Sequence, residues 1–412
     1  METVSIPEPK IALTINNGSS SSKFSLIMEG NADPMISINC ANIGRKDSVI
    51  SYKIAGEKNS VTVLLKDHKT AMKKAWELIK KNFPNINITA VGHRIVHGGP
   101  SFKESVLIET EVEKEIERCS PLAPLHNPAN LSGYRVAREL FPNTPHVAIF
   151  DTAFHAKMPE YAKRYAIPEK WYTEDMVAKY GFHGTSFQYV SRKFGALKGI
   201  YHEDLNLVVG HFGNGASIAK VERGISTDTT MGLTPLDGCV MGTRAGSIDP
   251  GIIDYIADIH KITASEVIKI LNNKSGLLAL FGDTNMMKVR EKYHEGDRRA
   301  ALTMDISAYR AAKFFASYLS TMENPRGIVF TAGIGENETV FRKRVLNFLK
   351  FYEWHIDVEA NMKRDCNICI AKGMKRMEAW VIPTNEELIL GEDSISIATT
   401  GHVPKLYSFE RI

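Results

Sequence analysis

Apolar residues follow two spacings along the chain, and each spacing predicts one kind of secondary structure. Short apolar runs within 10–29, 47–66 and 205–210 have the length of strands. In 69–83 and 298–322, apolar residues recur every three or four positions, which is typical of an amphipathic helix. The second helix is expected to bury one stripe, in the core or in a dimer, made of Leu302, Ile306, Tyr309, Ala312, Ala316, Leu319 and Met322.

Turns of small residues follow several of the predicted strands. The apolar run 205–209 leads into the turn HFGNGAS, whose small residues can direct backbone N–H groups at an anion. Open α/β sheets bind anions at such turns, although Asn-Gly also marks an ordinary hairpin. Similar turns occur in 16–23 and 331–337. The first two predict duplicated halves that face a shared ligand, and all three predict phosphate binding.

Length and charge limit the possible function classes. A chain of 412 residues is too long for one compact core and predicts two domains. The net charge of +4, without a dense Lys/Arg block, favours small anionic ligands over nucleic acid. No apolar run approaches the roughly 20 residues of a membrane span, and METVSIPEPK lacks a secretory h-region. We therefore expect a cytoplasmic protein with no membrane or nucleic-acid partner.

Three residues of the first half are candidates because of where they stand. Arg94 lies in an apolar predicted strand, where a buried guanidinium needs an anion, and a salt bridge to a protein carboxylate is the alternative to a ligand. Asp151 ends another predicted strand, as a site residue or as the cap of the next segment. His126 precedes a predicted helix, where a capping or core role is the commoner one.

The second half adds a histidine, an arginine and a pair of carboxylates. His183 stands between two glycines ahead of a helix, and Arg244 is central in the irregular segment 228–251, a kind of segment that is usually functional. The loop 331–337 is expected to open a helix whose N-terminus favours an anion. Glu386 is expected in a loop before the closing helix, together with Glu387.

These residue types fit phosphoryl transfer, which needs charge neutralisation and usually Mg²⁺. Arg94, Arg244 and His183 can neutralise phosphate oxygens, while Asn16 and Glu386 offer oxygen ligands to Mg²⁺ through its waters. The Walker A and GxGxxG fingerprints are absent, which argues against P-loop and Rossmann phosphate binding.

Ten motifs stand in the order typical of the acetate kinases and the closely similar propionate kinases, and the chain resembles this family over nearly its whole length. They are INNGSSSSKFSL, GHRIVHGG, APLHNPANLSG, FDTAFH, YGFHGTS, GHFGNGAS, MGLTPLDG, MGTRAG, FTAGIGEN and PTNEEL. The resemblance implies an α/β, actin/Hsp70/sugar-kinase-like (RNase H-like) fold, with duplicated βββαβαβα cores and a cleft between them. It implies an N-terminal domain of 1–152 plus 388–412, completed by the C-terminal helix, a nucleotide-binding domain of 153–387, and a homodimer.

The resemblance also implies an acid kinase that transfers the γ-phosphoryl group of ATP reversibly to acetate, directly and in line, giving acetyl phosphate and ADP. Arg94 and Arg244 would grip carboxylate and phosphoryl group, His183 would stabilise the transition state, His126 would be an auxiliary donor, and Asp151 an essential acid near the acyl substrate. Mg²⁺, or alternatively Mn²⁺, would be linked to Asn16 and Glu386. The implied acyl pocket is Val96, Leu125, Phe182 and Pro235. The expected nucleotide-binding set is Ser19, Lys23, His211, Asn214, Gly215, Asp283, Met286, Lys288, Gly333, Ile334 and Asn337.

Several alternatives stay open. The chain could be a propionate kinase, or it could use GTP or pyrophosphate as donor. A sugar kinase would need an Asp to accept the hydroxyl proton, and Asp151 could do so. A chaperone or filament ATPase of the same fold would lack the paired arginines. Val96 predicts acetate over propionate, because valine fills the space of the extra methyl group.

The chain departs from the family pattern where the nucleotide base is expected. Met286 and Lys288 stand where the family usually has an Asp and an Arg that contact the adenosine. Lys keeps the charge but loses the planar stacking surface, and Met cannot accept a ribose hydrogen bond. Asp283 and Asn285 are the nearby substitutes. We therefore expect ATP to be held mainly through its phosphates, with little selectivity among purines.

Overall fold

The computed structural model describes residues 9–18, 20–124 and 126–410. The chain divides into two compact units, and each is described by itself. Unit 1 comprises Met1–Phe154 and Asn385–Ile412, and unit 2 comprises His155–Thr384. The sequence predicted these boundaries after residues 152 and 387, whereas the units meet after residues 154 and 384. Within the described ranges, no helix is both long enough and apolar enough to cross a membrane.

Unit 1 is built on an eight-stranded sheet with the order β5-β4-β3-β2-β1-β6-β8-β7. The first five strands form an antiparallel meander, whereas β1, β6 and β8 run parallel. The hairpin and the further strands predicted at the N-terminus are confirmed, and the alternating strand β3 was not predicted. The strands are β1 (Ile11–Asn17), β2 (Ser22–Met28), β3 (Ile36–Ala41), β4 (Val49–Ile54), β5 (Glu57–Thr62), β6 (Ala90–Ile95), β7 (Val106–Leu107) and β8 (His146–Phe150).

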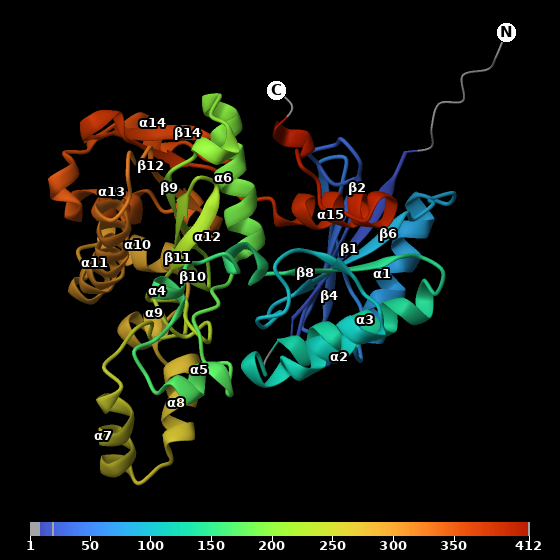
Figure 1. Ribbon diagram of the computed structural model, residues 1–412, viewed down its shortest axis with the longest axis horizontal. Helices are drawn as coiled ribbons and strands as arrows, with labels where there is room; N and C mark the ends of the chain where they lie inside the picture. Colours follow the sequence, from blue (N-terminus) through green and yellow to red (C-terminus); the bar gives the residue numbers. More distant parts are fainter. Residues whose placement is uncertain (1–8, 19, 125, 411–412) are drawn as a thin grey trace. The chain divides into compact units, whose positions relative to one another are not determined.

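Helices cover both faces of this sheet, because successive side chains of a strand point to opposite faces. In β8, Ala148 and Phe150 join a core with α2 (Thr110–Arg118) and α3 (Asn127–Leu140). Val147 and Ile149 instead pack on α15 (Glu386–Thr400). Helix α1 (His68–Asn82) contributes to a third cluster with β1 to β4. Figure 1 shows α15 on one side of the sheet and α1 and α3 on the other.

Two glycines let α15 approach the sheet closely. A Cβ atom on Gly92 of β6 would lie 2.2 Å from Oγ of Ser394, and one on Gly391 of α15 would lie 2.5 Å from Ile27 of β2. Both distances are far below a normal contact, so neither site accepts a side chain without displacing the helix. The last long helix of the chain is therefore an integral part of unit 1.

Unit 2 contains a seven-stranded sheet that repeats the order of unit 1. Its order is β11-β10-β9-β12-β15-β14-β13, with β11, β10 and β9 antiparallel and β9, β12 and β15 parallel. The strands are β9 (Leu207–Phe212), β10 (Ala216–Glu222), β11 (Ile225–Thr229), β12 (Gly327–Thr331), β13 (His355–Ile356), β14 (Ile368–Lys372) and β15 (Glu378–Val381). In unit 1 the corresponding run is β3-β2-β1-β6-β8. The duplicated α/β fold is thus confirmed.

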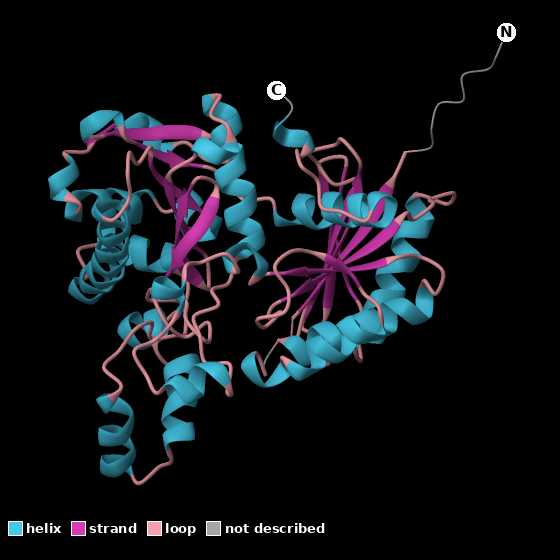
Figure 2. Ribbon diagram, in the orientation of Figure 1, coloured by secondary structure: helices cyan, strands magenta, loops and turns pink. Residues whose placement is uncertain are grey.

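Helices and one long irregular segment complete unit 2. Phe212, Phe315, Phe330 and Phe341 form an aromatic cluster that joins β9 and β12 to the helices α11 and α13. Neither helix nor strand occurs between β11 and α7, as predicted for this segment (Figure 2). The helices are α4 (Glu160–Lys163), α5 (Glu169–Thr173), α6 (Gly184–Lys198), α7 (Gly251–His260), α8 (Ala264–Asn273), α9 (Gly276–Phe281), α10 (Met286–His294), α11 (Arg298–Ser320), α12 (Ala332–Asn337), α13 (Thr339–Phe348) and α14 (Val358–Met362).

The predicted stripe of α11 is only partly buried in the core of unit 2. Leu302 is 59% exposed and Tyr309 is 51% exposed, whereas Ala312, Leu319 and Met322 are buried as expected. The helix turns a different face inward, made largely of small residues that allow close approach: Ala300, Thr303, Met304, Ser307, Ala308, Ala311 and Phe315. Packing against α13 and β10 therefore outweighs the apolar periodicity.

Two segments expected as loops are helical. Residues 332–337 form α12 itself, so the predicted loop is only the junction at Thr331. Glu386 and Glu387 form the first turn of α15, where Asn385 caps the helix by accepting a hydrogen bond from the amide of Leu388. Acidic side chains are favourable in a first turn because they complement the helix dipole.

Buried histidines predict that the fold is sensitive to acid. His93 and His146 share a hydrogen bond of 2.9 Å between Nε2 and Nδ1, and burial lowers the pKa of both. Burial also lowers the pKa of His97, His155 and His202, each to about 4. Between pH 6.5 and 4 these groups take up protons in the unfolded chain before they do so in the folded one. The free energy of unfolding should therefore decrease as the pH is lowered, by up to about 1.4 kcal/mol per pH unit for each histidine.

Thermal unfolding at pH 7, 6 and 5 measures this loss. The melting temperature should decrease steadily with pH in 0.5 M salt as well as in 0.1 M salt, because burial rather than surface repulsion is the cause. A melting temperature that is constant from pH 7 to pH 5, or a decrease abolished by salt, would contradict the assignment.

Candidate active site

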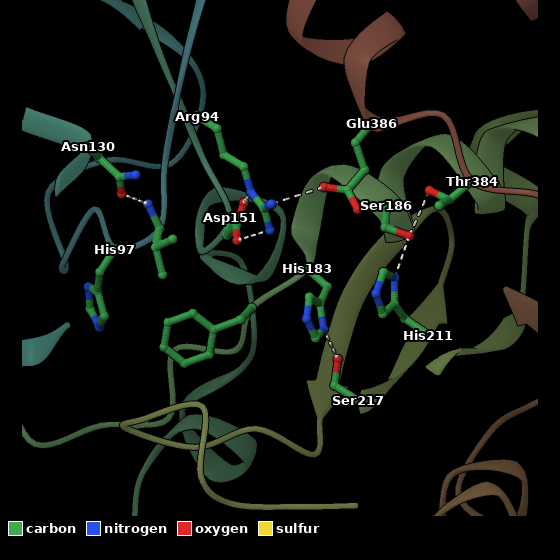
Figure 3. A network of polar contacts seen from close by, with 12 residues as sticks. Arg94, His97, Asn130, Asp151, His183, Ser186, His211, Ser217, Thr384 and Glu386 are labelled. Atoms are coloured by element: carbon green, nitrogen blue, oxygen red, sulfur yellow. Dashed lines mark hydrogen bonds and ion pairs between the residues drawn. The ribbon is translucent and has the colours of Figure 1, made fainter. Parts of the chain in front are cut away.

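An ion pair at the carboxyl ends of β6 and β8 is the centre of the site in unit 1. Nε and Nη2 of Arg94 donate to Oδ1 and Oδ2 of Asp151, each over 2.8 Å. Oε2 of Glu386 lies 3.6 Å from Nη1 of the same arginine (Figure 3). The side chain of Asp151 is 2% exposed and that of Arg94 is 19% exposed. The salt bridge considered as an alternative for Arg94 is therefore present in the structure.

The charges of this cluster do not cancel. Burial raises the pKa of Asp151, and the guanidinium of Arg94 opposes that shift. Burial acts to lower the pKa of Arg94, but Asp151 and Glu386 raise it above its ordinary value. One cation and two carboxylates leave a net charge of −1 when all three are ionised. An incoming carboxylate or phosphate would therefore need further positive charge nearby.

Two buried asparagines of α3 fix the chain that follows Arg94. Oδ1 of Asn130 accepts from the amide of Val96 over 3.1 Å. Asn127 accepts from the amide of His97 and donates to its carbonyl, over 3.0 and 2.8 Å. These asparagines were not among the predicted site residues, although their spacing of three in HNPANLSG places both on one face of a helix. They set the position of Val96.

The remaining candidates of unit 1 lie in loops or outside the described residues. His126 takes the N-cap position of α3, but its side chain makes no cap hydrogen bond. In the β1–β2 hairpin, half-buried Asn16 is paired in register with exposed Lys23. Ser19 and Leu125 lie outside the described residues.

Histidines stack beside the glycine-rich turn of unit 2. The rings of His183 and His211 are 4.1 Å apart at an angle of 13°. Nδ1 of His183 shares a 2.8 Å hydrogen bond with Oγ of Ser217, and Nδ1 of His211 shares one of 2.8 Å with Oγ of Ser186 (Figure 3). His183 has φ of 58°, a strained conformation for a residue other than glycine. Both rings are thereby held in fixed orientations.

Arg244 is a half-buried cation of unit 2. Its Nη1 donates to the carbonyl of Pro235 over 2.9 Å, and burial lowers the pKa of the guanidinium. In contrast to Arg94, it forms no ion pair with any described residue. A Cβ atom on Gly215 would lie 3.2 Å from Nε2 of His183 and 3.7 Å from Nη1 of Arg244, so the three groups converge. A desolvated cation without a counter-charge, beside an imidazole nitrogen and an open turn, favours an anion.

The turn 213–215 is a hairpin turn, since β9 and β10 are antiparallel and the amide of Gly213 donates to the carbonyl of Gly215.

The first amide of α12 is engaged by a side chain of the same helix. Ala332 donates to Oε1 of Glu336 over 2.7 Å, and burial raises the pKa of this carboxyl group. The predicted anion site at the N-terminus of this helix therefore has a protein carboxylate on its first N–H group.

A pocket of about 460 Å³ in unit 2 brings together five of the expected nucleotide-binding residues: Asn214, Met286, Gly333, Ile334 and Asn337. Asp283 and Lys288 do not line it and are paired with each other instead. Arg290 and Glu338, which were not among the predicted residues, also line the pocket. A larger pocket of about 960 Å³, beside the end of α11, holds none of the expected residues.

Comparisons with known proteins agree on one family. The Acetokinase family matches residues 11–392. An acetate kinase of Thermoanaerobacterium thermosaccharolyticum is 43% identical over 392 residues, which cover 93% of this chain and 98% of the relative. The crystal structure of a propionate kinase from Francisella tularensis superposes with a TM-score of 0.89 at 38% identity, covering 96% of this chain and 100% of that one. For Porphyromonas gingivalis acetate kinase the values are 0.87 and 34%, with 94% and 99% covered.

Removal of Asp151 should destabilise unit 1 through the charge left behind. Asp151→Ala leaves the guanidinium of Arg94 with only Glu386 at 3.6 Å, and we expect a loss of about 3 kcal/mol or more in the free energy of unfolding. Glu386→Gln breaks a longer and more exposed contact and should cost about 1 kcal/mol or less. Urea denaturation measures both. The double variant Arg94→Met/Asp151→Leu should recover much of the loss, and equal losses for the two single variants would contradict the assignment.

Proposed function

We propose that this chain, which belongs to the acetokinase family, transfers the γ-phosphoryl group of ATP reversibly to the carboxylate of acetate, giving acetyl phosphate and ADP. The observation that carries the proposal is the half-buried guanidinium of Arg244, which has no protein counter-charge among the described residues and converges with His183 on the open turn at Gly215. Relatives named acetate kinase, at 43 and 44% identity over nearly the whole chain, support the choice of substrate.

The residues suit an acceptor that is already a nucleophile. Acetate is an anion at neutral pH and needs no general base, so the barrier arises from bringing a carboxylate against a polyphosphate. Preorganised cations and hydrogen-bond donors lower such a barrier. A sugar kinase would need Asp151 as a base. Both of its oxygens are already engaged by hydrogen bonds from Arg94, which disfavours that alternative.

The roles divide between the two units. In unit 1, Arg94 grips the acyl carboxylate, Asp151 orients Arg94, and His126 is an auxiliary donor. In unit 2, Arg244 and Nε2 of His183 neutralise the transferring phosphoryl group in a direct in-line displacement. The proposed acyl-binding residues are Val96, Leu125, Phe182 and Pro235. The proposed nucleotide-binding residues are Ser19, Lys23, His211, Asn214, Gly215, Met286, Gly333, Ile334 and Asn337.

Magnesium is part of the proposal, with Mn²⁺ as the alternative. The described residues contain no group of three or more His, Cys, Asp or Glu that could hold a metal alone. This suits Mg²⁺, which is commonly held by one or two carboxylates, waters and substrate phosphates. The net charge of −1 around Glu386 also favours a cation. We propose that Asn16 and Glu386 hold Mg²⁺ through its waters, where it would neutralise phosphate charge.

A homodimer and a cytoplasmic location complete the proposal. Helix α7 has no buried residue, and Ile252, Tyr255 and Ile259 form one exposed apolar stripe along it. Such a stripe supports a partner copy. Sedimentation at twice the mass of the chain would agree with the homodimer, and sedimentation at the monomer mass would exclude it.

A hydroxamate assay with MgATP and short fatty acids tests the function, because it traps the acyl phosphate itself. We expect acetate to exceed propionate by about ten-fold or more in kcat/KM, with butyrate poor, since one methylene is worth about 1–3 kcal/mol in such a pocket. Val96→Ala should shift the preference towards propionate. The amide of Val96 is held by Asn130, so the backbone should stay in place.

The second candidate is a propionate kinase, favoured by the similarity to the Francisella enzyme. A wild-type preference for propionate would choose it. If no fatty acid gave a hydroxamate while a sugar was phosphorylated, acid-kinase activity itself would be excluded.

Arg244→Ala and Arg94→Ala should each lower kcat by about a thousand-fold or more, because each removes charge that stabilises the transition state. Lys at either position should restore activity only in part, since it lacks the planar fork. Arg244→Ala is the cleaner test, because it breaks no ion pair with a described residue. Arg298→Ala, at the exposed start of α11, is the matched control. Near-normal turnover of Arg244→Ala would refute the role.

A further inference from the structure

The nucleotide pocket of unit 2 contains a charged pair that the family resemblance does not assign. Nη1 of Arg290 lies 3.3 Å from Oε1 and 3.2 Å from Oε2 of Glu338, so one nitrogen bridges both oxygens. The side chains are 17% and 5% exposed, and both residues line the pocket with Asn214, Gly333 and Asn337. The pair therefore lies where a bound nucleotide would be in contact with it.

Hydrogen bonds to the preceding backbone help to fix the position of Glu338. Glu338 links α12 to α13, one residue after Asn337. The fully buried guanidinium of Arg342 donates to the carbonyls of Gly335 and Glu336, each over 2.8 Å, and so holds the backbone just before Glu338. Arg290 lies one helical turn after Met286 on α10. Two separate elements thus present the two charges.

Glu338 is buried but remains surrounded by positive charge. Burial raises the pKa of its carboxyl group, and the guanidinium groups of Arg290, Arg364 and Arg342 oppose that shift. Arg364 also lines the pocket. Of the donors of Arg290, only those on Nη1 bond to a described residue. The pocket therefore offers a carboxylate acceptor together with guanidinium donors.

Asp283 and Asn285, the expected substitutes for the missing adenosine contacts, are engaged by residues of their own segment. Oδ1 of Asp283 accepts from the amide of Asn285, and Oδ2 of Asp283 pairs with Lys288. Oδ1 of Asn285 caps α10 by accepting from the amide of Met287. Arg290 and Glu338 are accordingly the stronger candidates for contacts to the base.

We propose that Arg290 and Glu338 read the base of the phosphoryl donor, and that the pocket accepts a 6-oxopurine nucleotide at least as well as an adenine nucleotide. Guanine presents N1–H and its 2-amino group to two carboxylate oxygens, and O6 and N7 to guanidinium donors. Adenine offers one amino donor on that edge and turns the N1 acceptor towards the carboxylate. The inference rests on the proposed function, since it concerns the donor of the same reaction.

Donor specificity tests the inference in the hydroxamate assay. For the wild-type enzyme, kcat/KM with MgGTP should equal or exceed that with MgATP. ITP, which lacks the 2-amino group, should lie below GTP. Glu338→Gln keeps the shape of the side chain but removes an acceptor, so it should lower the GTP/ATP ratio by about ten-fold while affecting ITP less. Glu295→Gln, at the exposed C-cap of the same helix and outside the pocket, is the matched control and should leave the ratio unchanged.

A wild-type preference for ATP of ten-fold or more would overturn the inference, and so would a GTP/ATP ratio that is unchanged in a folded Glu338→Gln variant. The wild-type ratio decides the matter even if the variant fails to fold. Calorimetric binding of GDP and ADP separates this outcome from a failure of the proposed function. Tighter binding of GDP without acyl-phosphate formation would retain base reading and reject the acid kinase.

Discussion

A guanidinium removed from water requires negative charge, and this chain meets that requirement in two opposite ways. Arg94 is matched by Asp151 in a bidentate pair and approached by Glu386. Arg244 is comparably enclosed but bonds to the carbonyl of Pro235. The first arrangement holds the guanidinium of Arg94 in a fixed orientation. The second leaves a cation with which an anionic ligand can pair. The proposed reaction of a carboxylate with a polyphosphate would use both arrangements.

The repeated topology explains why candidate site residues follow equivalent strands in the two units. In each unit three antiparallel strands are followed by two parallel ones. The carboxyl ends of parallel strands gather at one edge of a sheet, which is where α/β folds place their ligands. Arg94 and Asp151 come from that edge of unit 1, and the turn at Gly213 and helix α12 come from that edge of unit 2. The fold therefore provides equivalent edges, and the side chains give each edge its own chemistry.

The sequence predicted the parts that local chemistry determines. Strands, the irregular segment around Arg244 and the turns of small residues follow from apolar runs and glycine positions. The inward face of α11 could not be predicted, because close packing of Ala, Ser and Thr turned Leu302 and Tyr309 outward. The structural role of Asn127 and Asn130 depends on two strand-end residues that lie far from them in the sequence. Glu338 stands in the polar run GENET, where nothing local distinguishes a buried carboxylate from a solvated one.

The difference between the phosphate end and the base end of a nucleotide explains where this chain can vary. Interactions with the transferring phosphoryl group act in the transition state, so changes there lower the rate. Contacts with the base bind substrate and transition state alike and chiefly set affinity and selectivity. Met286 and Lys288, in place of the Asp and Arg that the resemblance implies, are therefore compatible with the chemistry proposed for His183 and Arg244. It also leaves the recognition of the base to whichever buried polar groups face the pocket, and among the described lining residues the bridged pair of Arg290 and Glu338 has the donors and acceptors for it.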